Sequence, residues 1–208
     1  MNSKVEEQSI VNRETKYQSH GFKVEELTIK QGGKEIKRET FNRGNAAAAL
    51  VYNTDTKKYL FVQQYRPGAE GIMLEVVAGG IEEGEKPQDT IKREIAEELG
   101  YKVDKLIHIN DCYMSPGFNT EVIAIFYAEV SEKIGEGGGV DDEGITVVEV
   151  SDLGLNGNLF FDIPEDGDIV PPYKLIDAKS VIAVNWYMTS KLMRSLWETV
   201  SDYKMKSL

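Results

Sequence analysis

The most constraining feature of this sequence is residues 79–101, GGIEEGEKPQDTIKREIAEELGY, where a glycine-rich segment leads into a run of acidic residues. Three glycines in this segment allow close backbone approach and positive φ angles: Gly79, Gly80 and Gly84. Pro87 suits the first turn of a helix, and Gly100 suits the position just after its end. The stretch therefore predicts a tight turn followed by a helix over residues 87–99.

One face of this predicted helix is apolar and its edge is acidic. The apolar residues recur every four positions: Ile91, Ile95 and Leu99. The acids lie along the edge: Glu94, Glu97 and Glu98. Like charges three or four residues apart oppose helix formation by roughly 0.2 to 0.5 kcal/mol per pair, so these acids need a cation, a base such as Arg93, or solvent. Hard divalent cations prefer such oxygen ligands, and a solvated acidic face is the simpler alternative.

The full spacing of this stretch resembles the Nudix hydrolase box, GX5EX7REUXEEXGU, in which U is a bulky apolar residue. Every specified position is filled, by Gly79, Glu85, Arg93, Glu94, Ile95, Glu97, Glu98, Gly100 and Tyr101. A short glycine motif often matches by chance, whereas a pattern with this many specified positions does not. The resemblance to the Nudix hydrolase superfamily implies a metal-dependent pyrophosphohydrolase.

Composition and charge are compatible with one enzyme-sized domain. The chain has 208 residues, of which 41% are hydrophobic and 28% charged, enough to bury a sizeable core. Its formal net charge of -11 disfavours binding to nucleic acid or to an anionic membrane surface. A small anionic substrate remains compatible, provided that metal ions and a few arginines invert the local field.

The single cysteine, Cys112, excludes an intramolecular disulfide and a thiolate zinc cage, and we expect an ordinary thiol that is at least half-buried. Residues 1–22 contain no apolar core of a signal peptide, and no stretch approaches the roughly 18 apolar residues typical of a membrane span. These features predict a cytoplasmic protein.

Alternating apolar and polar residues over 22–30 and 34–41 flank a Gln31-Gly32-Gly33 turn and predict an N-terminal hairpin. Further strands are predicted at residues 46–52, 59–64, 73–77, 103–109, 122–130 and 145–150, with a covering helix over 174–200. Residues 136–144 and 156–172 are predicted loops.

This order predicts an α/β (α+β) class, with a mixed sheet between helices. The resemblance implies the Nudix fold, divided into an N-terminal extension over residues 1–44 and a Nudix hydrolase domain over residues 45–208.

Segments outside the box resemble the nucleoside-diphosphate-sugar branch of the superfamily, which includes ADP-ribose pyrophosphatases and GDP-mannose hydrolases. These segments read KRETFNRGNAAAAL, QQYRPG, MLEVVAGG, SPG and IDAKSVIAVNW. The SPG segment with Pro116 is similar to ADP-ribose enzymes, whereas GNAAA and GGGVDDEGI look more like the GDP-mannose branch. The resemblance thus implies hydrolysis of ADP-ribose to AMP and ribose 5-phosphate first, with GDP-mannose to GMP and mannose 1-phosphate as the alternative.

The resemblance also implies the metal ligands: the carbonyl of Ala78 and the carboxylates of Glu94, Glu97 and Glu98. Helix geometry independently places Glu94 and Glu98 one turn apart on one face. Mg²⁺ usually takes one or two carboxylates with waters and phosphate oxygens, and Mn²⁺ is a possible substitute. Arg93 and Glu85 are expected to form an ion pair that orients the loop.

Arg38 and Arg66 match arginines that contact the diphosphate in this branch, and a planar guanidinium suits phosphate oxygens. A surface arginine is an equal alternative for Arg38, whereas the diphosphate contact is favoured for Arg66, which ends a predicted strand just before Pro67 and a loop. Pro116 and Gly117 of the SPG segment are further candidates for substrate binding. In the same branch homodimers exchange N-terminal strands, so Arg38 would then complete the partner's site.

A carboxylate must accept the proton of the attacking water. In related enzymes this base lies on a mobile acidic loop, and the resemblance places Asp141 where the family usually has a glutamate, which is longer by one methylene. Glu143 and Glu121 are the other candidates, and solvated loop acids are the alternative for all three.

Three other functions fit these residues less well. A Nudix module that senses a nucleotide without cleaving it would be expected to lose the box glutamates, which are all present here. A purely structural interaction domain would explain the hairpin and the last helix but not the box. A nucleoside-triphosphate hydrolase of the same superfamily would share the box but not the segments that resemble the nucleotide-sugar branch.

Overall fold

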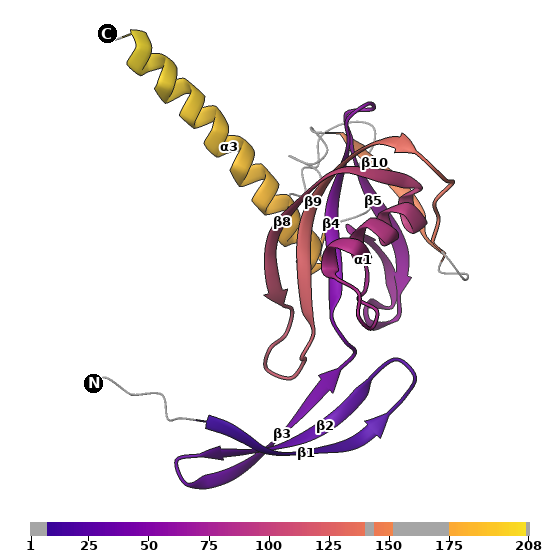
Figure 1. Ribbon diagram of the computed structural model, residues 1–208, viewed down its shortest axis with the longest axis vertical. Helices are drawn as coiled ribbons and strands as arrows, with labels where there is room; N and C mark the ends of the chain where they lie inside the picture. Colours follow the sequence, from indigo (N-terminus) through magenta and orange to yellow (C-terminus); the bar gives the residue numbers. More distant parts are fainter. Residues whose placement is uncertain (1–7, 140–143, 152–174, 207–208) are drawn as a thin grey trace. The chain divides into compact units, whose positions relative to one another are not determined.

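The computed structural model describes residues 8–139, 144–151 and 175–206, and the side chains of these residues as far as 198 (Figure 1). The chain divides into two compact units. The first unit comprises Met1–Ala46 with Asp111–Ile123, and the second comprises Ala47–Asn110 with Ala124–Leu208. The predicted loop over residues 156–172 lies outside the described residues.

The first unit is built on a three-stranded antiparallel sheet with the order β1-β2-β3. Its strands are β1 (Gln8–Gln18), β2 (Lys23–Gln31) and β3 (Lys34–Asn42). The hairpin of β2 and β3 confirms the sequence prediction. The sequence does not predict β1, because every residue of this strand is exposed and two register shifts interrupt the alternation that would mark a strand.

The second unit contains a sheet with the order β10-β5-β4-β9-β8, in which β6 also pairs with β5 and β7 with β4. Its strands are β4 (Ala46–Asn53), β5 (Lys58–Arg66), β6 (Gly71–Glu75), β7 (Val77–Gly80), β8 (Tyr101–Tyr113), β9 (Val122–Lys133) and β10 (Thr146–Ser151). A short 3-10 helix, η1 (Pro67–Ala69), connects β5 to β6. The predicted strands over 46–52, 59–64, 103–109, 122–130 and 145–150 are confirmed.

The prediction of one strand over residues 73–77 is wrong. The chain changes partner at Val76, because β6 pairs with β5 whereas β7 pairs with β4. A backbone that moves from one neighbouring strand to another cannot continue a single ladder, and β6 and β7 are therefore separate strands.

The predicted helix over residues 87–99 is present, but it is not uniform. Helix α1 (Pro87–Glu94) runs directly into a π-helical turn, η2 (Ile95–Leu99), which ends at Gly100 with a φ of 76°. The predicted apolar residues at positions 91, 95 and 99 are fully buried. Single π-helical turns are rare and occur frequently at functional sites.

The two faces of the sheet in the second unit carry different helices (Figure 1). On one face α1 and η2 pack in a hydrophobic cluster that includes Ala49, Leu60 and Phe126. The first part of helix α3 (Ala178–Lys206) packs on the other face, where Tyr187 contacts the rings of Tyr59 and Tyr127, whereas its residues 191–198 are exposed. This arrangement confirms the predicted α+β class with a mixed sheet between helices. No described helix is long and apolar enough to cross a bilayer.

Candidate active site

Gly79 lies where β7 passes directly over the acidic helix. A Cβ atom built on Gly79 would lie 1.9 Å from the Cδ and Oε1 atoms of Glu94, so only glycine leaves room for this carboxylate. The expectation of a turn at Gly79 and Gly80 is wrong, since both belong to β7 and neither has a positive φ. Gly84 does have one, at 81°. Close approach is therefore what requires glycine at position 79.

Arg93 is the hub of the acidic cluster. Its guanidinium donates to both carboxylate oxygens of Glu85 at 3.3 Å, which confirms the predicted ion pair. Its Nη1 atom also donates to Glu94 at 2.7 Å and to Glu97 at 3.1 Å, and its Nη2 atom donates to the carbonyl of Gly80 at 3.3 Å. One cation thus offsets the repulsion among three glutamates and ties the helix to the end of β7.

The contact between Arg93 and Glu85 shifts the pKa values of both residues. Hydrogen bonds from Arg93, followed by one involving Thr90, lower the pKa of Glu85 to about 2. Hydrogen bonding to Glu85 and the charge of Glu94 raise the pKa of Arg93. Glu85 and Arg93 are therefore both ionised at neutral pH.

The three box glutamates that follow Arg93 differ in their surroundings. Glu98 is 5% exposed, whereas the Glu97 side chain is 32% exposed and the Glu94 side chain lies between them. The negative charge of Glu98 also contributes to raising the pKa of Arg66, after the hydrogen bonds and charge of Glu75 and the charge of Asp177. The charge of the acidic helix thus reaches Arg66, and the place of this arginine in the site stays a prediction.

Arg66 is fixed by a second buried carboxylate. Its Nε and Nη2 atoms donate to the two oxygens of Glu75 at 2.8 and 2.7 Å, and Lys179 adds an ion pair to Glu75 at 2.7 Å. Glu75 is 2% exposed. Burial alone would raise its pKa, but the hydrogen bonds of Arg66 and the charge of Lys179 outweigh burial and lower this pKa to about 2. Sequence reasoning missed Glu75 and Lys179, whose only signal was the MLEVVAGG and IDAKS segments.

The end of the predicted acidic loop that the structure describes is held against the helix. The backbone N–H groups of Gly138 and Gly139 donate to the carbonyls of Glu98 at 2.8 Å and Glu97 at 3.1 Å. A Cβ atom on Gly137, whose φ is 76°, would lie 2.7 Å from the carbonyl oxygen of Glu98. Glycines at this point therefore let the loop backbone satisfy carbonyls that a helix end leaves without intrahelical partners.

The remaining predicted residues belong to the first unit or lie outside the described residues. Arg38 is exposed on β3 and donates to the carbonyl of Lys37 at 2.9 Å. Pro116 and Gly117 form an exposed turn, which the hydrogen bond from Phe41 N to Phe118 O, 2.7 Å long, joins to the end of β3. Glu121 forms an ion pair with Arg43 at 3.5 Å. Asp141 and Glu143 lie outside the described ranges, so all three base assignments stay predictions.

Comparison with known proteins places this acidic site in a family. A profile of the NUDIX domain matches residues 42–173, which include β7, α1 and η2. The chain belongs to the Nudix family. It is a Nudix pyrophosphohydrolase, as the box predicts, and Nudix enzymes generally use a divalent metal ion.

Curated relatives agree with this assignment, and a solved structure shares the fold. A GDP-mannose pyrophosphatase of Salmonella paratyphi B is 38% identical over 165 residues, which cover 76% of this chain and 80% of that protein. A GDP-mannose pyrophosphatase of Escherichia coli O9:H4 is 34% identical over 178 residues, covering 81% and 86% respectively. The crystal structure of an ADP compounds hydrolase superposes with a TM-score of 0.71 at 20% identity, covering 92% of this chain and 97% of the other.

The donors at the Nudix helix suit a hard divalent cation. Three carboxylates and the carbonyl of Ala78 offer oxygen ligands, and Gly79 keeps open the space beside Glu94 that a Cβ would fill. Within the described ranges no group of three acidic, histidine or cysteine side chains is arranged so that it could hold a metal ion by itself. Waters and substrate phosphates would therefore complete the shell, as they usually do for Mg²⁺.

The ionised Glu75 is expected to make stability depend on pH. Its pKa is about 2 in the folded chain against an ordinary value of 4.5, so its contribution is complete above pH 4.5 and is lost as the pH falls toward 2. The shift corresponds to at most about 3 kcal/mol in the free energy of unfolding. Urea midpoints measured at pH 6 and pH 3 should fall less with acid in Glu75→Gln than in the wild type. Equal losses in the two proteins would contradict this role.

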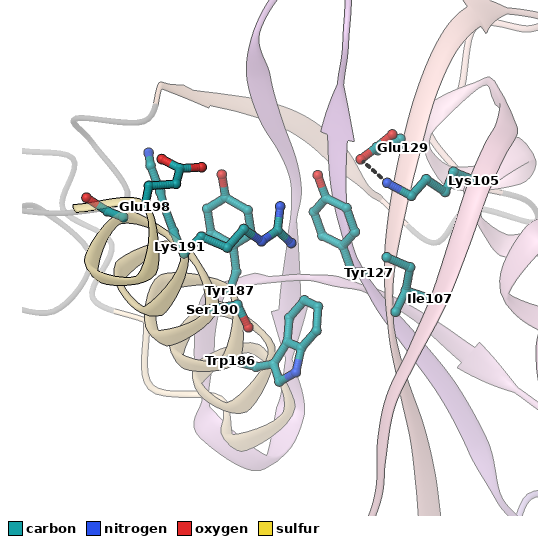
Figure 2. A pocket seen from close by; sticks show the side chains of 11 residues that line it. Lys105, Ile107, Tyr127, Glu129, Trp186, Tyr187, Ser190, Lys191 and Glu198 are labelled. Atoms are coloured by element: carbon teal, nitrogen blue, oxygen red, sulfur yellow. Dashed lines mark hydrogen bonds and ion pairs between the residues drawn. The ribbon is translucent and has the colours of Figure 1, made fainter. Parts of the chain in front are cut away.

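A separate cavity of about 330 Å³ lies between α3 and strands β8 and β9. Figure 2 shows Ile107 and Tyr127 on the sheet side of this cavity and Trp186 and Tyr187 on the helix side. Burial and then the charge of Glu129 raise the pKa of Tyr127, which keeps its hydroxyl protonated. Tyr127 alternates with Phe126, which packs in the cluster beneath the Nudix helix, so the cavity and that helix lie on opposite faces of the sheet. Among the predicted site residues that the structure describes, none lines this cavity.

Proposed function

We propose that this enzyme hydrolyses the diphosphate bond of a nucleoside diphosphate sugar, and that GDP-mannose is its preferred substrate. The relatives named GDP-mannose pyrophosphatase, 34–38% identical over at least three quarters of the chain, support this choice. Sequence reasoning ranked ADP-ribose first and GDP-mannose second, and the relatives favour the reverse order. The likeness to an ADP compounds hydrolase is too distant in sequence to bear on the substrate.

The single observation that carries the proposal is the acidic cluster on the Nudix helix. Its glutamates surround Arg93 beneath Gly79, so the cluster is ordered and faces the end of β7. The charges of Arg93 and Arg66 are each offset by carboxylates, which leaves the site short of positive charge for a diphosphate even though one nitrogen of Arg66 can still bind a phosphate oxygen. A divalent cation restores the balance, and this is the physical reason to expect metal dependence.

The proposed roles follow the donors. The carbonyl of Ala78 with Glu94, Glu97 and Glu98 would hold Mg²⁺, which when bound neutralises the diphosphate and lowers the pKa of water. Arg93 keeps the glutamates in place through its hydrogen bonds.

Hydrolysis itself forms one bond and breaks another. The oxygen of water attacks one phosphorus, and the bond from that phosphorus to the bridging oxygen breaks. The bridging oxygen leaves with the other phosphate, giving GMP and mannose 1-phosphate. A carboxylate takes the proton of the water, and Glu121, Asp141 and Glu143 are the proposed candidates for this base.

The extension over residues 1–44 is proposed to mediate a homodimer by strand exchange, with Arg38 contributing to the partner's site and with Pro116 and Gly117 in substrate binding. What supports the exchange is β1, an edge strand of the three-stranded sheet whose unpaired edge can accept another strand. A monomer in sedimentation that retains full activity would contradict the exchange.

The proposal predicts the products of a direct assay. The purified protein with Mg²⁺ or Mn²⁺ should convert GDP-mannose to GMP and mannose 1-phosphate, and EDTA should stop the reaction. Chromatography identifies the products, and ADP-ribose and other nucleotide sugars are tested in parallel. AMP with ribose 5-phosphate as the main products would move the preference to ADP-ribose. A folded, metal-bound protein that turns over none of these substrates would refute hydrolysis and favour a binding module.

A further inference from the structure

A closed network of buried polar groups joins the start of α3 to the strands that carry the site. The Ser180 hydroxyl accepts a hydrogen bond from Val76 N at 2.9 Å and donates to Asp177 at 2.6 Å. Lys179 forms ion pairs with Asp177 at 2.9 Å and with Glu75 at 2.7 Å. Because Glu75 precedes Val76 in the chain, these contacts close a ring, all within the second unit.

The groups of this network are largely removed from water, so their role is something other than keeping the protein soluble. Ser180 is fully buried, Lys179 is 8% exposed and Glu75 is 2% exposed. Buried lysines are rare, and a charge removed from water is costly unless it is paired. Here two carboxylates are matched by Lys179 and Arg66, so the network is electrically balanced. Such groups can specify one arrangement rather than add stability.

Lys179 determines how Arg66 can lie. With Lys179 neutralising Asp177 and bonding one oxygen of Glu75, the guanidinium of Arg66 is left with a single two-pronged contact to Glu75. That contact uses Nε and Nη2, and Nη1 has no hydrogen-bond partner among the described residues. Because a guanidinium is planar, fixing two nitrogens fixes the direction of the third. The nitrogen that remains for a phosphate oxygen is therefore held in one direction.

Ser180 acts at the other end of the network. Its hydroxyl binds the N–H group of Val76, the residue where the chain passes from β6 to β7 and leaves one strand partner for another. Two residues further on is Ala78, whose carbonyl is a proposed metal ligand, and Gly79 follows over Glu94. The first turn of α3 thus fixes both the proposed phosphate ligand and the strand of the proposed metal ligand.

We propose that Lys179 and Ser180 are positioning residues for diphosphate hydrolysis, Lys179 by orienting Arg66 through Glu75 and Ser180 by holding the junction of β6 and β7. This inference rests on the proposed function. It adds that α3, which contributes no predicted ligand, helps to set the geometry of the site from the other face of the sheet.

A double-mutant cycle tests the role of Lys179. Lys179→Met should lower kcat/KM for the nucleotide sugar by roughly tenfold to a hundredfold, mainly through KM, because a displaced contact of about 1 Å has effects of this size. In an Arg66→Ala background the same substitution should change kcat/KM by less than about twofold, because coupled residues are not additive. Lys191→Met, which removes an exposed lysine from the same helix, is the matched control and should leave both constants unchanged.

Two outcomes would overturn the inference. One is a folded Lys179→Met enzyme with wild-type kcat/KM, and the other is an equal loss of kcat/KM on Lys179→Met in the wild-type and the Arg66→Ala backgrounds. Should Lys179→Met fail to fold by circular dichroism, the paired variant Glu75→Gln with Lys179→Met removes one charge of each sign and must show the same loss. Ser180→Ala should also lower kcat/KM, but with a similar loss in the Arg66→Ala background, since Ser180 acts through β7.

Failure of the proposed function is recognised separately. If the wild type turns over no nucleotide sugar, calorimetric titration with GDP replaces the kinetic assay. The positioning role would then be supported if Lys179→Met weakens GDP binding in the protein that keeps Arg66 but not in the Arg66→Ala variant. Equal GDP affinities for wild type and Lys179→Met, or no GDP binding by either protein, would overturn it.

Discussion

Glu98→Gln is expected to lower kcat by about a hundredfold to a thousandfold at saturating Mg²⁺ while the protein stays folded, because charge stabilisation by a metal is worth several kcal/mol. Glu98 is the most buried of the three box glutamates and lies one turn from Glu94. Glutamine has nearly the same shape but lacks the negative charge that binds a cation. The initial rate at several Mg²⁺ concentrations and the melting temperature are the measurements.

A suitable control for this substitution is Glu83→Gln, which removes an exposed acid from the loop just before the Nudix helix. It changes the net charge by the same amount without touching a proposed ligand, and it should retain wild-type kcat. Glu98→Gln with near wild-type kcat would exclude Glu98 as a metal ligand. A loss shared equally by both variants would point instead to the total charge of the loop and helix.

The sequence predicts those parts of the site whose residues lie close together in the chain. Ile91, Ile95 and Leu99 recur every four residues. This spacing predicts the buried face of the helix, and all three residues are buried in the structure. Arg93 and Glu85 are likewise only eight residues apart, and their contact follows from the box pattern. The three apolar residues lie on one helical run, where periodicity determines which side chains share a face, and Glu85 lies in the loop just before that run.

The rest of the site depends on contacts that no local pattern reveals. Lys179 meets Glu75, and Ser180 meets Val76, across 104 residues of sequence in each case. A lysine near the start of an apolar helix is usually taken as exposed, so its burial could not be anticipated. The break between β6 and β7 has the same origin, since it arises from a change of strand partner rather than from composition.

The π-helical turn is a further feature that residue spacing does not predict. Residues 95–99 match a regular helix in their apolar pattern, and the departure from it occurs where Gly138 and Gly139 bond the carbonyls of Glu98 and Glu97. The loop therefore satisfies the helix end through glycine backbone rather than through a capping side chain. The glycine-rich, acidic segment predicts a loop, which the structure confirms for residues 136–139 and 144, but the segment does not show that part of this loop is fixed to the helix of the proposed metal ligands.

Gly79→Ala is expected to lower activity roughly tenfold to a hundredfold and to raise the Mg²⁺ concentration needed for half-maximal rate, in the range seen when support of a metal ligand is lost. The added Cβ would lie 1.9 Å from the Glu94 carboxylate, which must move away. The obstructing atoms are the end of a flexible side chain, and the φ of Gly79 is not left-handed, so alanine fits the backbone. The melting temperature should change little.

Gly80→Ala separates this steric effect from any general intolerance of alanine in β7. Gly80 is the next residue of the same strand, also without a positive φ, and a Cβ on it would meet no atom within 4 Å. It should therefore keep wild-type activity and the wild-type Mg²⁺ dependence. Equal losses in both variants would show that the strand itself, rather than space for Glu94, is what glycine protects. A change confined to Gly79→Ala ties the first residue of the Nudix box to the position of one carboxylate.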